Sequence, residues 1–200
     1  MSTLRATIAP VLALLALAGA GSASAVVLPF TGTEMNDTPT PAPSPLCAGG
    51  QVLVSFSPST AITSGMSNFG AFGPTMSHCL TPPPTSYSGG VFDFAFAAGD
   101  DLVGTYSGHF TPTGTPNLLN TFIDFVVTGG TGRFEDASGW LHAEGLLDRR
   151  VLRPINNVTL TGVLSLPAVP EPSAWALMIL GFGAVGATLR QRRVRGPQAA

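Results

Sequence analysis

The chain has 200 residues, of which 44% are hydrophobic and 10% are charged, and its net charge at pH 7 is −2. Between its two apolar ends it carries four arginines, no lysine and ten carboxylates, a net charge of −6. This charge argues against nucleic acid or acidic polysaccharide as a partner held by electrostatic attraction.

The amino terminus is organised like a secretory signal peptide. Arg5 supplies a positive start, residues 11–18 form a short apolar run, and Ala23-Ser24-Ala25 provides small residues for cleavage. This order predicts that residues 1–25 are removed after Ala25 and that the rest of the chain is exported.

A proline-rich stretch follows the signal peptide. Four prolines alternate with small or polar residues at positions 39, 41, 43 and 45. The composition predicts a stiff, polyproline-like linker over residues 26–46. The folded domain is then expected over residues 47–166, a length that suits one domain with its own core but not two.

Cys47 and Cys79 are the only cysteines, and both lie in the part expected to be exported. An oxidising compartment favours a disulfide between them. A redox or metal-binding pair is the alternative, although the close C-x-x-C spacing typical of such pairs is absent.

The domain is dominated by alternation of apolar and polar residues, which indicates half-buried strands. We expect Phe94, Phe125, Val127 and Leu160 to lie in the interior, with turns at proline and glycine clusters between strands. Strands are predicted over residues 51–56, 91–96, 102–110, 121–128, 139–146 and 157–166. Six or more short strands without a credible soluble helix favour an all-β fold, a small antiparallel barrel or sandwich.

One internal motif is more specific. Residues 128–139 read TGGTGRFEDASG, and this segment resembles the hairpin of the allene oxide cyclase and dirigent barrels. The resemblance covers about 12 to 20 residues, supports a small barrel and implies no catalytic residue. Gly129, Gly130 and Gly132 would permit a tight turn, while Phe134 and Ala137 would pack the returning segment. A phosphate-binding loop is disfavoured because no Gly-Lys-Ser/Thr follows.

Candidate catalytic groups are few. Trp140, His142 and Glu144 would share one face of a strand, as a metal or acid–base site requires, but a solvated polar face explains them as well. Asp124 is expected to point outward, because Ile123, Phe125 and Val127 make the better core face. Asp100-Asp101 is typical of a turn. We therefore predict no catalytic residue, no metal site and no cofactor.

The carboxyl terminus combines an extended motif, an apolar stretch and a basic end. Pro170 and Pro172 restrict the backbone around Glu171 to extended conformations. Residues 173–189 carry no charge and predict a helix of about 25 Å, which is marginal for a hydrocarbon core of about 30 Å. Trp175 suits a membrane interface, and Arg190, Arg192, Arg193 and Arg195 predict a cytoplasmic stop-transfer end.

This tail, residues 167–195, closely resembles the PEP-CTERM protein-sorting signal of Gram-negative bacteria, a segment also called the ice-binding protein C-terminal domain. The resemblance implies that Pro170, Glu171, Pro172 and Trp175 form the sorting motif, read by an exosortase, a membrane cysteine transpeptidase. The protein would then pass through the inner membrane, stay there transiently through its helix, and reach the cell surface or the medium. A plain tail anchor is the alternative. Extracellular polysaccharide as a partner in a biofilm matrix follows from the family association only.

Three functions remain open at this point. The first is a non-enzymatic protein of the cell envelope or extracellular matrix, and the second is a barrel that binds or isomerises a small hydrophobic ligand. An apolar cavity of several hundred Å³ with a convergent carboxylate would favour the second, and a filled interior the first. The third is ice or surface binding through the threonine rows 111/113/115 and 159/161, which are short or interrupted by proline.

Overall fold

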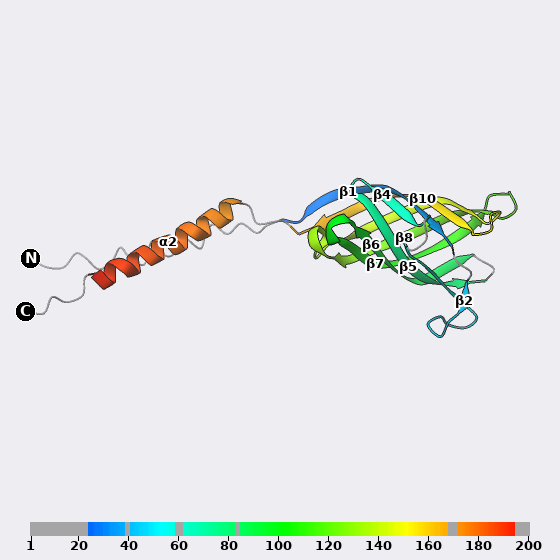
Figure 1. Cartoon of the computed structure of the whole chain (residues 1–200), viewed down its shortest axis with the longest axis horizontal. Helices are drawn as coiled ribbons and strands as arrows, with labels where there is room; N and C mark the ends of the chain where they lie inside the picture. Colours follow the sequence, from blue (N-terminus) through cyan, green and yellow to red (C-terminus); the bar gives the residue numbers. More distant parts are fainter. Residues whose placement is uncertain (1–23, 39–40, 59–61, 83–84, 168–171, 195–200) are drawn as a thin grey trace, which may run out of the picture. The chain divides into compact units, whose positions relative to one another are not determined.

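A computed structural model describes residues 24–38, 41–58, 62–82, 85–167 and 172–194 (Figure 1). The chain divides into two units. The larger is a β domain of residues 25–167, and the other contains the carboxyl-terminal segment with its helix.

The domain is a closed antiparallel barrel of eight strands. Their order around the barrel is β5-β4-β1-β10-β9-β8-β7-β6, and β6 pairs again with β5 to close the ring. Two further strands extend the sheet. The first residues of β5 pair with β4, its later residues pair with β3, and β3 in turn pairs with β2. The bounds are β1 Val26–Asp37, β2 Ala42–Pro43, β3 Val52–Phe56, β4 Ser64–Ser67, β5 Gly70–Thr81, β6 Ser86–Phe96, β7 Asp101–Pro112, β8 Leu118–Gly130, β9 Ser138–Asp148 and β10 Ile155–Leu166.

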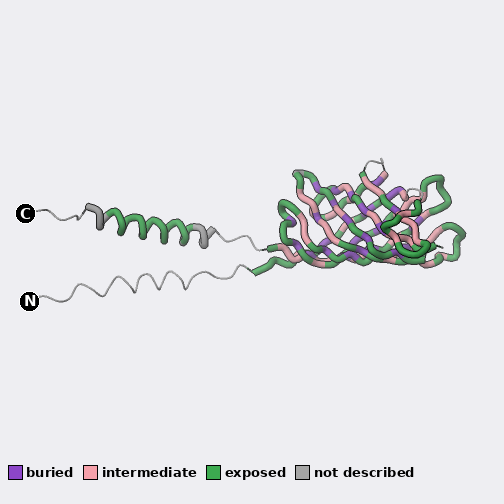
Figure 2. Tube along the Cα trace, turned by 90° about the horizontal axis from the view of Figure 1, so that it is seen from below, coloured by how far each residue is buried: buried purple, intermediate pink, exposed green. Residues whose placement is uncertain are grey.

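The strands form where successive side chains point alternately into the barrel and toward its outer surface. Figure 2 shows buried and exposed positions alternating along the barrel wall. In β8 the inward residues Ile123, Phe125 and Val127 are buried, whereas Asp124 and Val126 face outward. All four predicted interior residues, Phe94, Phe125, Val127 and Leu160, are at most 3% exposed. The predicted antiparallel barrel is therefore confirmed.

One end of the barrel is closed by aromatic packing. The connection from β8 to β9 contains a short 3-10 helix, η2 (Gly132–Phe134), which inserts the fully buried ring of Phe134. This ring contacts Phe69 and Phe96 at centroid distances of 5.6 and 5.0 Å, and the guanidinium of Arg133 lies 4.8 Å from its centre. Ala137 is buried beside it, as the sequence predicted.

The glycines of this connection are needed for two different reasons. Gly132 has φ of +58°, a left-handed conformation that glycine adopts without strain. Gly130 is the last residue of β8, where a Cβ atom would lie 2.1 Å from the carbonyl oxygen of Asp101. Gly129 precedes it in β8 and has open space around it.

The expected linker over residues 26–46 is wrong in its first half. Residues Val26–Asp37 form β1, which pairs along its whole length with β10, so the domain begins near residue 25 and not at Cys47. The inward positions of β1 hold Phe30, Gly32, Glu34 and Asn36. Because glycine and two polar residues occupy inward positions, apolar and polar residues do not alternate regularly along β1. The sequence pattern therefore did not predict this strand.

The predicted disulfide between Cys47 and Cys79 is confirmed, with a Cα–Cα distance of 5.5 Å. It ties the connection between β2 and β3 to the end of β5. The loop that it closes spans 32 positions along the chain. On the chain-entropy account, such a cross-link stabilises the folded state by about 3 to 4 kcal/mol.

We expect the double variant Cys47→Ser/Cys79→Ser to lose about 3 to 4 kcal/mol of unfolding free energy, because its unfolded chain is no longer cross-linked. Urea denaturation of the full-length protein measures this loss. Wild-type protein denatured in the presence of a reductant serves as the matched control and should give the same value. Equal stabilities with and without the cross-link would contradict the prediction.

The second unit contains helix α2 (Pro172–Val194), which covers the predicted helical range 173–189. Its described side chains, Ala176 and residues 178–190, are all exposed. Within the described residues, no helix meets the length and apolarity that crossing a membrane requires.

Candidate functional site: a pocket in the open mouth of the barrel

The end of the barrel opposite Phe134 is open and holds a cavity of about 720 Å³. Its walls come from β3, from the second halves of β1, β5, β7 and β9, and from the first halves of β6, β8 and β10, together with the segment after β1 and the connection between β9 and β10. The apolar part of the lining consists of Pro41, Val52, Val54, Phe56, Leu80, Pro82, Phe110, Ile123, Leu147, Leu152 and Pro154. A cavity of this size and lining is typical of sites for small organic molecules.

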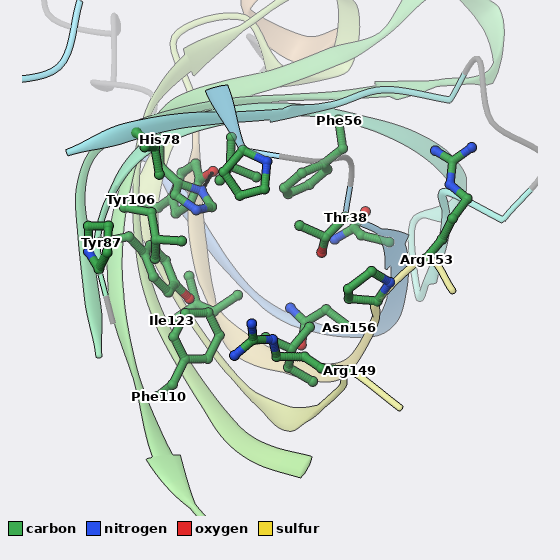
Figure 3. Close-up of a pocket in the computed structure, with 18 of the residues that line it drawn as sticks. Thr38, Phe56, His78, Tyr87, Tyr106, Phe110, Ile123, Arg149, Arg153 and Asn156 are labelled. Carbon is green, nitrogen blue, oxygen red and sulfur yellow. Dashed lines mark hydrogen bonds between the residues drawn. The ribbon is translucent and has the colours of Figure 1, made fainter. Parts of the chain in front are cut away.

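The deep part of the pocket carries polar groups that are already paired. His78 and Tyr106 approach each other at 2.7 Å between Nδ1 and the phenolic oxygen, and the ring of His78 stacks on Tyr87 at 4.4 Å. The hydroxyl of Tyr87 donates to the carbonyl oxygen of Phe122 at 3.3 Å. Below them, Tyr106 packs on Phe125 of the filled core at 5.4 Å. The pocket therefore has a firm aromatic floor (Figure 3).

Burial decides the ionisation of these groups. It lowers the pKa of His78 from 6.5 to about 4, so this imidazole is neutral at pH 7. Burial also raises the pKa of Tyr87 and Tyr106 well above 10. The floor thus presents uncharged aromatic rings.

A buried carboxyl group lies on the inward face of β1, two residues before a residue of the pocket wall. Glu34 is 1% exposed, and Asn36, which lines the pocket, donates its Nδ2 to Glu34 Oε1. Among the described residues, Glu34 Oε2 and Asn36 Oδ1 have no hydrogen-bond partner. Burial raises the pKa of Glu34 from 4.5 to about 7, and the bond from Asn36 offsets only part of this effect.

The mouth carries two arginines that line the cavity. Arg153 Nη2 is 2.6 Å from Oδ2 of the buried Asp37. Figure 3 shows the side chain of Arg149 extending inward over the cavity. Within the described part of the chain, the Arg149 guanidinium takes part in no ion pair or hydrogen bond; only its backbone amide is bonded, to Asn117.

The predicted surface group of Trp140, His142 and Glu144 does share the outer face of β9, away from the pocket. His142 lies 2.8 Å from Asp124 Oδ1 and 3.0 Å from Glu144 Oε1, and the bond with Asp124 raises the pKa of His142. The Asp124 side chain is 72% exposed, as expected. Among the described residues, no group of three His, Cys, Asp or Glu side chains is arranged so that it could hold a metal ion.

The remaining predicted positions are spread over the chain. Asp100 lies after the short 3-10 helix η1 (Ala97–Gly99) and forms an ion pair of 3.1 Å with Arg133, which agrees with a turn role. Thr113 and Thr115 follow β7 in a turn, so they do not extend a flat row from Thr111. His109 stacks on Phe122 on the outer face.

Four of the ten predicted processing residues lie outside the part of the chain that the structure describes. Ala23, Pro170, Glu171 and Arg195 lie outside the described residues, and Ala25 immediately precedes β1. Pro172, Trp175, Arg190, Arg192 and Arg193 lie in α2.

Sequence reasoning missed the pocket itself. Its residues come from eight separate segments, and only closure of the barrel brings them together. Two signals were present: an alternating run from Phe72 to Leu80 with His78 inward, and three arginines between residues 149 and 153. The first is weakened by Gly73 and Pro74, which are depleted from strands.

Fold and site together define a small antiparallel β-barrel with one aromatic, closed end and one pocketed mouth. Residues 168–193 match the family model of the PEP-CTERM protein-sorting motif. The chain is therefore a substrate of exosortase-type sorting and is exported. No curated protein and no solved structure matches the chain.

Proposed function

We propose that this protein is an exported binding barrel that holds a small, mainly apolar molecule in its mouth and is delivered by its sorting tail. The observation that carries the proposal is the cavity of about 720 Å³ in the open mouth. A purely structural matrix protein has no need of such a cavity, because a filled interior is more stable.

The lining supports binding through burial of apolar surface. Eleven of the nineteen residues that form the pocket are aliphatic, proline or phenylalanine, and the two tyrosines and His78 add aromatic faces. Burying a ligand against them gains about 25 cal/mol per Å² of apolar surface. Preformed walls keep the ordering cost low, because strands and a disulfide hold them in place.

Binding without catalysis fits the chemistry of the floor better than isomerisation does. A general acid or base works best when its pKa lies near the working pH. The pKa of His78 is lowered to about 4 and that of Tyr106 is raised far above its usual value, so neither exchanges a proton readily near pH 7. Glu34 has a suitable pKa, yet it lies behind Asn36 and does not line the cavity.

The tail supports a role outside the cell. We propose that Pro170, Glu171, Pro172 and Trp175 form the part that the exosortase-type enzyme reads, and that a signal peptide ending at Ala25 starts export. A place in the cell envelope or extracellular matrix is consistent with this route. The net charge of −6 in the domain favours neutral over acidic matrix material.

Filling the pocket should abolish binding. We expect Leu147→Trp to raise the dissociation constant of the neutral fluorescent probe N-phenyl-1-naphthylamine at least tenfold, because the indole would occupy the cavity. Leu146→Trp is the matched control: this neighbour faces outward and is 44% exposed. Fluorescence titration of the full-length protein measures both, with circular dichroism to verify folding. A wild type that does not bind the probe, or a Leu147→Trp variant that binds it normally, would refute the proposal.

A further inference from the structure

The charges of the barrel single out one arginine. The domain holds four arginines and ten carboxylates, so a guanidinium readily finds a partner. Three do so: Arg133 with Asp100 at 3.1 Å, Arg150 with Asp148 at 2.7 Å, and Arg153 with Asp37 at 2.6 Å. Of the four arginines of the domain, Arg149 alone has no ion pair with a described residue, and its side chain extends over the pocket (Figure 3).

The position of Arg149 is fixed by its neighbours. Its backbone amide donates to the carbonyl oxygen of Asn117 at 2.8 Å, which joins the end of β9 to the turn before β8. The preceding Asp148 is held by Arg150 through two side-chain bonds of 2.9 and 2.7 Å, so this carboxylate already has a partner. Arg149 therefore presents an uncompensated positive charge at the rim of an apolar cavity.

The deeper polar groups offer no charged partner for a ligand. His78 is neutral and paired with Tyr106, Tyr87 is bonded to the backbone, and Asn156 accepts a bond from Thr121 at 2.9 Å. Asn36 Oδ1, which has no partner among the described residues, is an acceptor and suits an uncharged donor rather than an anion. A charge on the ligand would have to be desolvated to reach them. At the rim it can stay partly hydrated while it contacts Arg149.

We propose that the ligand is an amphiphile with an anionic group, such as a carboxylate, that pairs with Arg149 while its apolar part fills the cavity. This inference rests on the proposed binding function and adds the chemical class of the ligand. The guanidinium can bind a carboxylate through two parallel N–H bonds. A hydrogen bond between charged groups contributes about 1.5 to 3 kcal/mol, which corresponds to roughly a tenfold to hundredfold gain in affinity.

The test compares three molecules with the same chain and different head groups. Decanoate, decan-1-ol and decylamine, each below its micelle-forming concentration, compete with N-phenyl-1-naphthylamine for the full-length protein. We expect decanoate to compete at a concentration at least tenfold lower than decan-1-ol, and decylamine to be the weakest. Raising the salt concentration should reduce the advantage of decanoate, because the pair is partly exposed.

Three arginine substitutions test whether Arg149 causes the preference for decanoate over decan-1-ol. Arg149→Gln should bring decanoate to the level of decan-1-ol, and Arg149→Lys should restore part of the preference. Arg133→Gln removes the same charge at the closed end of the barrel and should leave the preference unchanged, because Arg133 does not line the pocket. Equal competition by decanoate and decan-1-ol in the wild type would overturn the inference, as would an equal loss in the Arg133→Gln variant. Failure of the probe and of all three molecules to bind would instead refute the proposed binding function.

Discussion

The Glu34→Gln variant is expected to be more stable than the wild type by about 3 kcal/mol at pH 8, and equally stable near pH 4.5. Glu34 is 1% exposed, and one of its oxygens has no partner among the described residues. Burial raises its pKa from 4.5 to about 7. A shift of this size corresponds to about 3 kcal/mol.

The sign follows from the protons that each state holds. Below pH 4.5 the carboxyl is protonated in both the folded and the unfolded chain. Between pH 4.5 and 7 the folded protein keeps a proton that the unfolded chain loses, so the free energy of unfolding falls as the pH rises, and it levels off above pH 7. Glutamine is neutral at every pH, so the free energy of unfolding of the variant does not fall between pH 4.5 and 7 through this residue.

His78 works in the opposite direction in the same protein. Its pKa is lowered from 6.5 to about 4. Between these two pH values His78 is therefore protonated in the unfolded chain and neutral in the folded protein. The contribution of His78 to the free energy of unfolding is fully present above pH 6.5 and is lost as the pH falls toward 4. The two contributions oppose each other in the wild type, and Glu34→Gln removes one of them, so the free energy of unfolding of the variant should rise more steeply between pH 4.5 and 6.5 than that of the wild type.

Urea denaturation of the full-length protein between pH 4.5 and 8 measures these effects. Glu135→Gln, a substitution of an exposed glutamate, is the control and should change stability by less than about 0.5 kcal/mol. A Glu34→Gln variant that loses stability at pH 8, or one whose gain is the same at every pH, would show that Glu34 is not a buried acid of raised pKa.

The second large effect concerns the tail. Glu171→Ala should abolish processing in a host with an intact exosortase-type system, while export of the barrel continues. Because proline restricts its own backbone and that of the residue before it, the sequence predicts that Glu171 is presented on an extended peptide of the kind that processing enzymes bind. Mass spectrometry of the mature carboxyl terminus measures processing directly.

Gln191→Ala, a change of similar size in the same tail, is the control and should be processed normally. Glu171→Asp keeps the charge and should retain part of the processing. If the Glu171→Ala protein is processed and released like the wild type, recognition of the motif through Glu171 is excluded.

Sequence reasoning succeeded where side chains alternate strongly. Strands β6 to β10 were predicted because rows such as Phe92, Phe94 and Phe96 are apolar on one face only. The outward position of Asp124 and the cysteine pairing also followed from local pattern and compartment. These features depend on neighbours along the chain and on general chemistry.

Strands β1, β4 and β5 were missed because their inward faces are not uniformly apolar. Glu34, Asn36 and His78 point into the barrel, and Gly65 leaves room for the ring of Phe72, which a Cβ atom would meet at 2.1 Å. Two of these polar inward residues, Asn36 and His78, line the pocket. Local hydropathy is therefore least informative at the place where the proposed function resides, because a binding site departs from the rule of an apolar interior.

The seam between β1 and β10 has a consequence for export. The first strand of the domain pairs with the last, with Val26 opposite Leu166 and Asp37 opposite Ile155. Such a ring cannot close while its final strand is still being synthesised or translocated, and contacts between distant parts of a chain form slowly. Closure of the barrel must therefore wait until Leu166 has emerged, only a few residues ahead of the sorting motif. A variant that folds slowly is therefore expected to present its sorting tail before the barrel has closed.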